Sequence, residues 1–347
     1  MNYIYEPAAA FAWCLEGLHR LCAWAGVPAW VGDWTGALAV MFSLFGFASV
    51  MVMILVYGER KVAAHMQARL GPMRVGWHGL LQVIADVIKL MFKEAFVPAE
   101  ADNWIYRAAP YVVFVPGFMA LIAIPMAKNV IPAQVNLGLL YVLAVSTPGV
   151  IGILMAGWSS GNKYSLLGGM RSAAQMVSYE VPLVLSVLGV IMLSESMDLH
   201  AIVEAQKVPF ILYQPLAFVI FLIAAVAETN RNPFDIPEAE SELTAGFHTE
   251  YGGVRFAYFF LAEYVNMFVL SALAVTLFLG GWKGPFLPGW LWYLGKTFAL
   301  LFLFMWFRWT FPRLRADQLM NLGWKVLTPL AFLNLIVTAL VLVFIGK

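Results

Sequence analysis

Four ionisable side chains stand within long apolar stretches of this chain: Glu180, Glu228, Glu263 and Lys296. A charge at the centre of a lone membrane helix costs at least about 2.5–3.5 kcal/mol, so such residues tend to face a helix bundle and to mark ion or substrate pathways. Three carboxylates at one depth would repel one another if all were ionised. We therefore expect at least one to carry a proton, as in a proton relay. For Lys296 we expect a structural role, because its long side chain could reach the membrane surface.

The segment 231–255 is strongly acidic, with five acidic residues against two basic ones. Pro237 in a first turn, flanked by acids three residues apart, indicates a helix N-terminus, where carboxylates complement the helix dipole. Capping accounts for the first two acids of the segment but not for the next two. A hydrated proton entrance or a basic partner subunit would explain the excess. The four clustered acids are Asp235, Glu238, Glu240 and Glu242.

The composition identifies an integral membrane protein before any motif is considered. Hydrophobic residues make up 62% of the 347 positions and charged residues only 12%, against about 25% charged in typical soluble domains. The net charge of +1 offers no basic field for nucleic acid. The two cysteines, Cys14 and Cys22, are too few for an iron–sulfur cluster, which takes four ligands.

Eight segments are long and apolar enough to cross a hydrocarbon core about 30 Å thick, and each must be helical, because backbone groups in lipid have to pair internally. The sequence thus predicts an all-α integral membrane protein, a bundle of about eight transmembrane helices. It forms a single membrane domain (1–347) with an outer-side head (1–34), a bundle (36–345) and two long inner loops (58–107 and 231–255). The predicted spans are 36–57, 108–127, 137–158, 173–194, 210–230, 256–280, 288–307 and 326–345.

The distribution of Lys and Arg predicts the orientation of the bundle. With residue 1 on the outer side, 15 of the 21 basic residues fall on inner loops, as the positive-inside rule requires, and both termini face out. In this orientation Glu180 and Glu263 lie about 10 Å from the inner end of their spans, at 1.5 Å per residue. Glu228 lies close to the inner end of its own span. All three carboxylates are therefore expected in the inner third of the membrane.

Residues 77–95 are long enough to be a ninth span but have the pattern of an amphipathic helix. Gln82, Asp86, Lys89 and Lys93 recur at steps of four, three and four, which places them on one helical stripe. A ninth span would also put most later basic residues on the wrong side. We therefore predict a helix in the inner interface within the first inner loop. Residues 7–27 could form a second such helix on the outer side.

Motifs for other chemistry are missing from the sequence. It contains no phosphate-binding loop, no dinucleotide fingerprint and no cluster of Cys and His at metal-ligand spacing. All five histidines fall outside the predicted spans, which excludes a transmembrane haem with two axial histidines. We expect no redox cofactor bound by this chain, so electrons for any redox reaction would come from a partner.

The chain resembles the family of membrane subunits designated H or 1 in respiratory complex I, NADH:quinone oxidoreductase. The resemblance covers about residues 35–345 and is most specific at 227–253. The matching stretches are GERKVAAHMQARLGP (58–72), GLLQVIADVIKLMFKE (79–94), AGWSSGNKYSLLGGMR (156–171), SYE (178–180), AETNRNPFDIPEAESELTAGFHTEYGG (227–253), LAEY (261–264) and FPRLRADQLMNLGWK (311–325).

The resemblance implies a quinone-tunnel membrane subunit of a proton-pumping enzyme, which is not catalytic alone. Ubiquinone or menaquinone would be the bound substrate. The partners would be the peripheral quinone-site and terminal iron–sulfur subunits and the small membrane subunits beside it. The location would be the inner membrane of a bacterium, mitochondrion or plastid. By this resemblance the proton-coupling residues are Glu180, Glu228, Glu263, Asp235, Glu238, Glu240 and Glu242, and the tunnel residues are Arg60, Phe234, Asp86 and Lys89.

The third span departs from the family pattern. It reads STPGVIG (146–152), with Pro148 and Ile151 where relatives often have a leucine and a tyrosine. A hydrogen bond from that tyrosine to the buried charges is therefore not expected here.

Other functions stay open on the sequence alone. The equivalent subunit of a membrane-bound hydrogenase, or of a complex with another electron donor, would carry the same three intramembrane acids. A stand-alone cation/proton antiporter predicts transport by the isolated chain and inverted repeats, and no such repeat is evident. A passive membrane anchor would leave the three glutamates unexplained.

Overall fold

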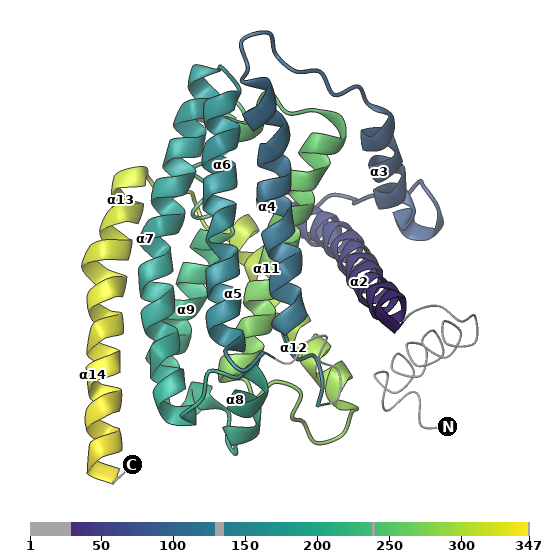
Figure 1. Ribbon diagram of the computed structural model, residues 1–347. Helices are drawn as coiled ribbons and strands as arrows, with labels where there is room; N and C mark the ends of the chain where they lie inside the picture. The colour runs from purple at the N-terminus through teal and green to yellow at the C-terminus, as the bar shows by residue number, and fades with distance from the viewer. Residues whose placement is uncertain (1–28, 129–134, 238–239, 346–347) are drawn as a thin grey trace.

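The computed structural model describes residues 29–128, 135–237 and 240–345, and within these ranges the chain is all helical (Figure 1). The predicted all-α class is confirmed. The longer helices are α2 (Ala29–Met66), α3 (Gln82–Phe92), α4 (Asn103–Ala123), α5 (Gly138–Ser146), α6 (Pro148–Ser159), α7 (Lys163–Ser194), α9 (Pro215–Glu228), α11 (Gly253–Phe278), α12 (Gly289–Thr310) and α14 (Thr328–Ile345). The short elements are α8 (Leu199–Ala205), α10 (Glu240–Leu243), α13 (Ala316–Asn321), the 3-10 turns η1 (Trp77–Gly79), η2 (Phe210–Leu212) and η3 (Gly246–His248), and the π-helical turn η4 (Leu322–Leu327).

Seven helical stretches of the described chain are long and apolar enough to cross a membrane, counting α5 with α6 and α13 with α14. They correspond to seven of the eight predicted spans, so the chain is a multi-pass membrane protein. The eighth, predicted at 210–230, is helical only over the 14 residues of α9. At 1.5 Å per residue α9 is about 21 Å long, shorter than the hydrocarbon core. Its packing against α7, α11 and α14 explains why it can be short, since backbone enclosed by protein need not span lipid.

The first helix is much longer than predicted. The span predicted at 36–57 is part of α2, which runs for 38 residues and includes 58–66, the start of the predicted first inner loop. A helix of that length measures about 57 Å and extends well beyond the hydrocarbon core. The basic residues at 60 and 61 ended the apolar stretch in the sequence, but they did not end the helix. This continuation carries Glu59 into the protein interior.

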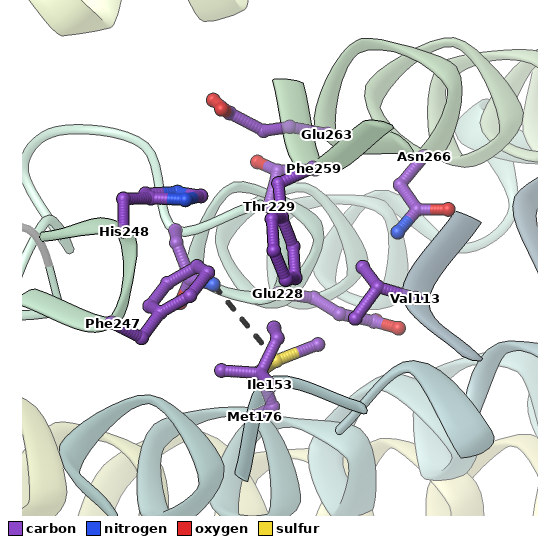
Figure 2. Close-up of a pocket in the computed structure, with 11 residues that line it drawn as sticks. Val113, Ile153, Met176, Glu228, Thr229, Phe247, His248, Phe259, Glu263 and Asn266 are labelled. Atoms are coloured by element: carbon purple, nitrogen blue, oxygen red, sulfur yellow. Dashed lines mark hydrogen bonds between the residues drawn. The ribbon is translucent and has the colours of Figure 1, made fainter. Parts of the chain in front are cut away.

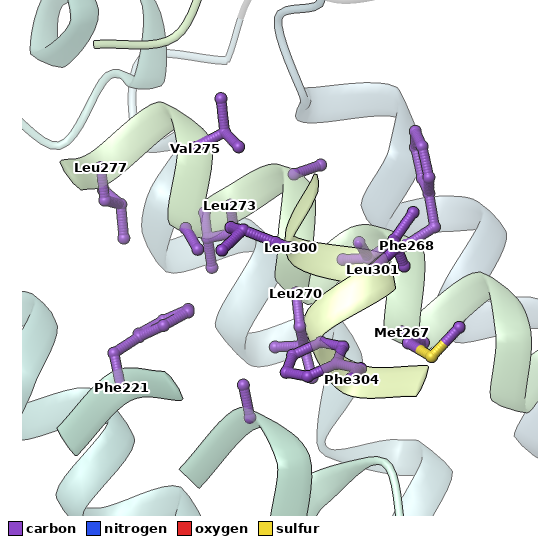
Figure 3. Packing of buried hydrophobic residues seen from close by; sticks show 14 of the residues in the cluster. Phe221, Met267, Phe268, Leu270, Leu273, Val275, Leu277, Leu300, Leu301 and Phe304 are labelled. Atoms are coloured by element: carbon purple, nitrogen blue, oxygen red, sulfur yellow. The ribbon is translucent and has the colours of Figure 1, made fainter. Parts of the chain in front are cut away.

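Helix α11 forms the centre of the bundle. Of its most apolar 18 residues, 78% are buried, a larger share than in any other spanning helix of the described chain. Figure 3 shows its side chains Leu270 and Leu273 packed against Phe221 of α9 and against Leu301 and Phe304 of α12. Apolar residues on all sides are typical of a helix enclosed by others. A carboxylate on α11 is therefore held in place by neighbours from several helices.

The predicted amphipathic segment 77–95 does contain a helix, α3, preceded by the turn η1. It lies beside α2 and α11, outside the main group of helices (Figure 1). Val83 is buried, whereas Ile84, Val87, Ile88 and Met91 are exposed, as expected of an apolar stripe that meets lipid. The possible second amphipathic helix at 7–27 and both cysteines lie outside the described residues.

The loop that follows α9 is locked against α7 through glycines. A Cβ atom built on Gly168 of α7 would lie 2.7 Å from the Cα atom of Gly246 in η3, closer than real Cβ contacts. The same helix meets α6 where Gly157 and Gly169 face each other. Close backbone approach through small residues is a common way to pack membrane helices. Here it sets the position of the acidic segment relative to the bundle.

We expect the substitution Gly168→Ala to destabilise the protein by about 1–3 kcal/mol, as overpacking does, because neither backbone at the contact can move freely. The measurement is the thermal midpoint of the purified full-length chain in detergent. Gly149→Ala in α6 is the matched control, since an added Cβ there meets nothing within 4 Å. Equal midpoints for the two variants would contradict the close contact.

Candidate functional site

The guanidinium of Arg231 lies at the junction between α9 and the acidic segment and is almost completely buried. Its Nη1 donates to both carboxylate oxygens of Glu59, at 2.9 and 2.8 Å. Its Nε lies 2.6 Å from Oε1 of Glu263. Isolated charges are very costly to bury, so each of these ions depends on the others. The arrangement joins the end of α2 to α11 through a loop residue.

Two further side chains complete this ion cluster. Arg308 of α12 donates through Nη1 to Glu59, and the Tyr264 hydroxyl donates to Oε2 of Glu59 at 2.7 Å. The Arg231 guanidinium also lies over the Tyr264 ring, 4.5 Å from its centroid. With two arginines and two glutamates the cluster is formally neutral. We call Glu59, Arg231, Glu263, Tyr264 and Arg308 the ion cluster.

The backbone around the cluster is held by amide side chains. The Gln175 amide of α7 donates to the carbonyl oxygens of Ala227 and Phe234, each at 2.7 Å. Asn232 donates to the carbonyl oxygens of Arg308 and Phe311, each at 3.0 Å, and a cis bond joins Asn232 to Pro233. These bonds satisfy carbonyl groups that a loop at this depth would otherwise leave unpaired. The loop is thus a fixed part of the site.

A small cavity beside the cluster is lined by both Glu228 and Glu263 (Figure 2). It has a volume of about 40 Å³, enough for a few water molecules, since one needs roughly 10–15 Å³ by this measure. A second cavity of about 20 Å³ lies on the other side of Glu228. Asn266 lines both. Glu228 therefore stands between two spaces that can each hold water.

The third predicted carboxylate, Glu180, is close enough to Glu228 for their charges to interact. Its Oε1 accepts a hydrogen bond from the Thr147 hydroxyl at 2.7 Å. Thr147 lies between α5 and α6, directly before Pro148. The hydroxyl supplies a polar partner for Glu180 from within the segment 146–152. The structure thus places Glu180 within electrostatic range of Glu228, and Glu228 and Glu263 on one cavity.

The four predicted acids of the loop differ in how far their side chains are exposed and described. Asp235 is half-buried, whereas Glu242 is exposed and accepts a hydrogen bond from Arg171 at 2.8 Å. That bond, helped by the charge of Arg313, holds the pKa of Glu242 below its usual value. Glu240 opens α10, and nothing is described of its side chain. Glu238 lies outside the described residues.

The predicted tunnel residues form two separate contacts. Arg60 of α2 pairs with Asp86 of α3 at 2.5 Å, and Gln82 donates to the other oxygen of Asp86. Lys89 is exposed on the same helix. Phe234, in contrast, is buried against Tyr179 of α7, with ring centroids 5.4 Å apart. Arg60 and Glu59 are neighbours in sequence but point to different surroundings, because successive helical residues are about 100° apart.

The structure adds residues that the sequence did not single out: Glu59, Arg231, Arg308, Tyr264 and His248. Glu59 was assigned to a loop, because the predicted span ended at residue 57. A hydrophobic pattern followed through residue 66 would have kept it on the helix. Arg231 was treated only as one of the basic residues of the loop.

Lys296 of α12 binds backbone carbonyl groups, an arrangement compatible with the structural role expected of it. Its Nζ donates to the carbonyl oxygens of Leu279, Gly281 and Lys283, just beyond the C-terminal end of α11. A cation at a helix C-terminus satisfies free carbonyl groups and complements the helix dipole.

We expect Glu59→Gln to destabilise the protein by about 3–5 kcal/mol, the range typical when one partner of a buried ion pair is removed. Both arginines then lose their shared carboxylate. Urea unfolding of the full-length chain in detergent micelles measures the effect. The control is Asp317→Asn, which breaks the exposed pair with Arg315 and should cost less than about 1 kcal/mol. A small effect for Glu59→Gln would show that the cluster contributes little to stability.

His248 makes stability depend on pH in a defined direction. Burial lowers the pKa of His248 from 6.5 to about 4, although Glu263 acts in the opposite sense. The unfolded chain therefore binds a proton at this residue between about pH 6.5 and 4 when the folded chain does not, and stability falls as the pH is lowered through that window. We expect wild type to lose up to about 2 kcal/mol more than His248→Asn between about pH 7 and pH 5. Parallel curves for His248→Asn and wild type would refute the shift.

Comparison with known proteins identifies the family of the chain. A family model described as NADH dehydrogenase matches residues 38–339. Proteins named as the H subunit of NADH-quinone oxidoreductase include one from Anoxybacillus flavithermus, 55% identical over 89% of this chain and 96% of the relative. Another, from Dehalococcoides mccartyi, is 53% identical over 88% of this chain and 87% of the relative. One of the H subunits of the same enzyme from Geobacter sulfurreducens is 50% identical over 88% of this chain and 94% of the relative. The chain therefore belongs to the NADH dehydrogenase family, as an H-type membrane subunit of NADH-quinone oxidoreductase, respiratory complex I.

Proposed function

We propose that this subunit links quinone reduction to proton movement through the ion cluster and the three intramembrane glutamates. The observation that carries the proposal is that Glu263 takes part in both: it pairs with Arg231 and lines the cavity shared with Glu228. A change of charge at the loop can therefore alter the protonation of the intramembrane carboxylates through Glu263. Names that specify NADH and quinone among the relatives favour this function over a hydrogenase subunit.

The quinone would approach at the gap between α2 and α3. The ion pair of Arg60 and Asp86 and the exposed Lys89 supply polar groups there, beside the apolar stripe of α3. Phe234 would border the inner part of the tunnel. The chain brings no redox centre to this scheme, and electrons would come from an iron–sulfur group in a neighbouring peripheral subunit. Ubiquinone and menaquinone both fit this chemistry.

Reduction of a quinone to a quinol takes up two electrons and two protons. The transient negative charge would attract Arg231 and Arg308, the two cations of the ion cluster, and weaken their ion pairs with the carboxylates. A carboxylate that loses its counter-ion in a low-dielectric site gains affinity for a proton. Glu263 would take up that proton first, because it shares Arg231 directly with Glu59.

A proton gained at Glu263 would then move towards Glu228 and Glu180. Water in the cavity that Glu263 and Glu228 both line can bridge these two residues, and electrostatic repulsion couples Glu228 to Glu180. Glu180, held by Thr147 on the side of α6 and α7, would pass the signal to a small membrane subunit of the complex. The acids Asp235, Glu238, Glu240 and Glu242 would supply protons at the loop. The loop side would face the inner compartment and both termini the outer one, by the distribution of basic residues.

We expect Glu228→Gln and Glu263→Gln to cut quinone-linked proton pumping by at least about tenfold in the assembled complex, because an amide cannot take up and release a proton. Pumping is measured in proteoliposomes with NADH and a quinone, and assembly is checked by subunit content. Glu204→Gln in α8, an exposed acid remote from the cavities, is the matched control. Normal pumping in both site variants would refute the coupling role.

A further inference from the structure

One titratable group of the site has no place in the scheme above. His248, in η3, lines the same cavity as Glu228 and Glu263. Figure 2 shows the Glu263 carboxyl group on the His248 side of this cavity, and the Glu228 carboxyl group directed away from it, towards Val113 and Asn266. The two carboxylates thus face different directions. A proton that moves from one to the other therefore passes along the cavity that His248 also lines.

The imidazole ring of His248 is held firmly in position. The rings of Phe247, Phe256 and Phe259 surround it, with centroids 3.9, 5.5 and 5.3 Å from that of His248. The turn that carries it is packed against α7 at the contact of Gly246 with Gly168. Rigid placement on a tightly packed turn is what a proton-transfer group needs, because transfer depends on hydrogen-bond geometry.

The charges that face the ring come from two helices. Glu263 of α11 acts on His248 directly, and Glu228 of α9 lines the same cavity. The lining residues from α4, α6 and α7, which are Val113, Ile153 and Met176, are apolar. A proton in this cavity therefore meets only the two carboxylates, the imidazole and the neutral polar groups of Thr229, Asn230 and Asn266.

We propose that His248 is a proton-relay residue between Glu263 and Glu228. One ring nitrogen accepts a proton from the Glu263 side while the other releases a proton to water in the cavity, which delivers it to Glu228. The imidazole is neutral before and after the event, so no net charge and no co-reactant are required. This inference rests on the proposed function, since it assigns a path to the protons that the glutamates exchange.

The electrostatic setting of His248 suits such a role. Burial keeps the ring neutral near physiological pH, with its pKa lowered to about 4. A neutral imidazole has one nitrogen able to accept a proton and another able to donate one. A ring that holds its extra proton weakly does not trap it, and the negative charge of Glu263 favours the brief cationic state.

The test replaces the ring in the assembled complex and asks whether a diffusible base restores pumping. We expect His248→Gly to pump protons at least about tenfold more slowly than wild type, within the range for loss of an acid–base group. Added imidazole should restore a substantial part of the rate. Pyrazole, which has nearly the same shape but is a much weaker base, should not. The control is His200→Gly, which removes a ring that packs against Trp282 and does not line the cavity, and this variant should pump normally.

A role in packing alone predicts equal rescue by imidazole and pyrazole, and that result would overturn the proposal. Normal pumping by His248→Gly, or no rescue by imidazole, would overturn it as well. If the glycine variant does not assemble, His248→Asn keeps a polar planar group that cannot relay a proton, and its pumping must then fall by the same factor. Pumping by Glu228→Gln, measured in the same experiment, separates the proposed function from the relay. Normal pumping by Glu228→Gln refutes the coupling role. Slow pumping by Glu228→Gln together with normal pumping by the His248 variants refutes only the relay.

Discussion

The structure of the site depends on the cost of burying the guanidinium of Arg231. A charge enclosed at this depth requires counter-charges, and two of them, Glu59 and Glu263, come from helices far apart in the sequence. Satisfying Arg231 draws the C-terminal part of α2 and the middle of α11 to the same loop. Arg308 balances the second carboxylate and adds α12. The membrane bundle and the acidic loop are joined at this point by ions and not by apolar packing.

This arrangement explains why the loop lies fixed inside the fold. Gln175 and Asn232 satisfy backbone carbonyl groups on either side of Arg231, and glycine contacts leave no room between the loop and α7. A buried polar network is stable only when its members are satisfied. A charge that appears nearby would disturb that balance. In the coupling that we propose, the disturbance would alter the proton affinity of Glu263.

In the path that we propose, Glu228 is the acid that lines two small cavities. One is shared with Glu263 and His248, and the other is also lined by Ser146, the last residue of α5. Glu180 accepts a hydrogen bond from Thr147, the residue that follows Ser146. The side chains from α4, α6 and α7 that line the first cavity are apolar, which limits the number of polar groups that a proton would meet there. The short α9 matters here, because its C-terminal end places Glu228 within the bundle.

The sequence by itself determined the class of the protein and the approximate positions of seven of the eight predicted spans, and it singled out three carboxylates in apolar stretches, because burial in lipid imposes a strong and local rule on composition. It also identified the amphipathic helix and the acidic loop, which are read from periodicity and charge within a single segment. Only the tertiary structure decided that Glu59 belongs to the interior, since the predicted end of its span rested on neighbouring charges that in fact lie on the other face of α2. The partnership of Arg231 with Glu59 and Glu263, and the position of His248 in the cavity, involve residues up to about 200 positions apart. Pairings of that kind arise from the packing of whole helices, and they cannot be predicted from the hydrophobicity or charge pattern of a single segment.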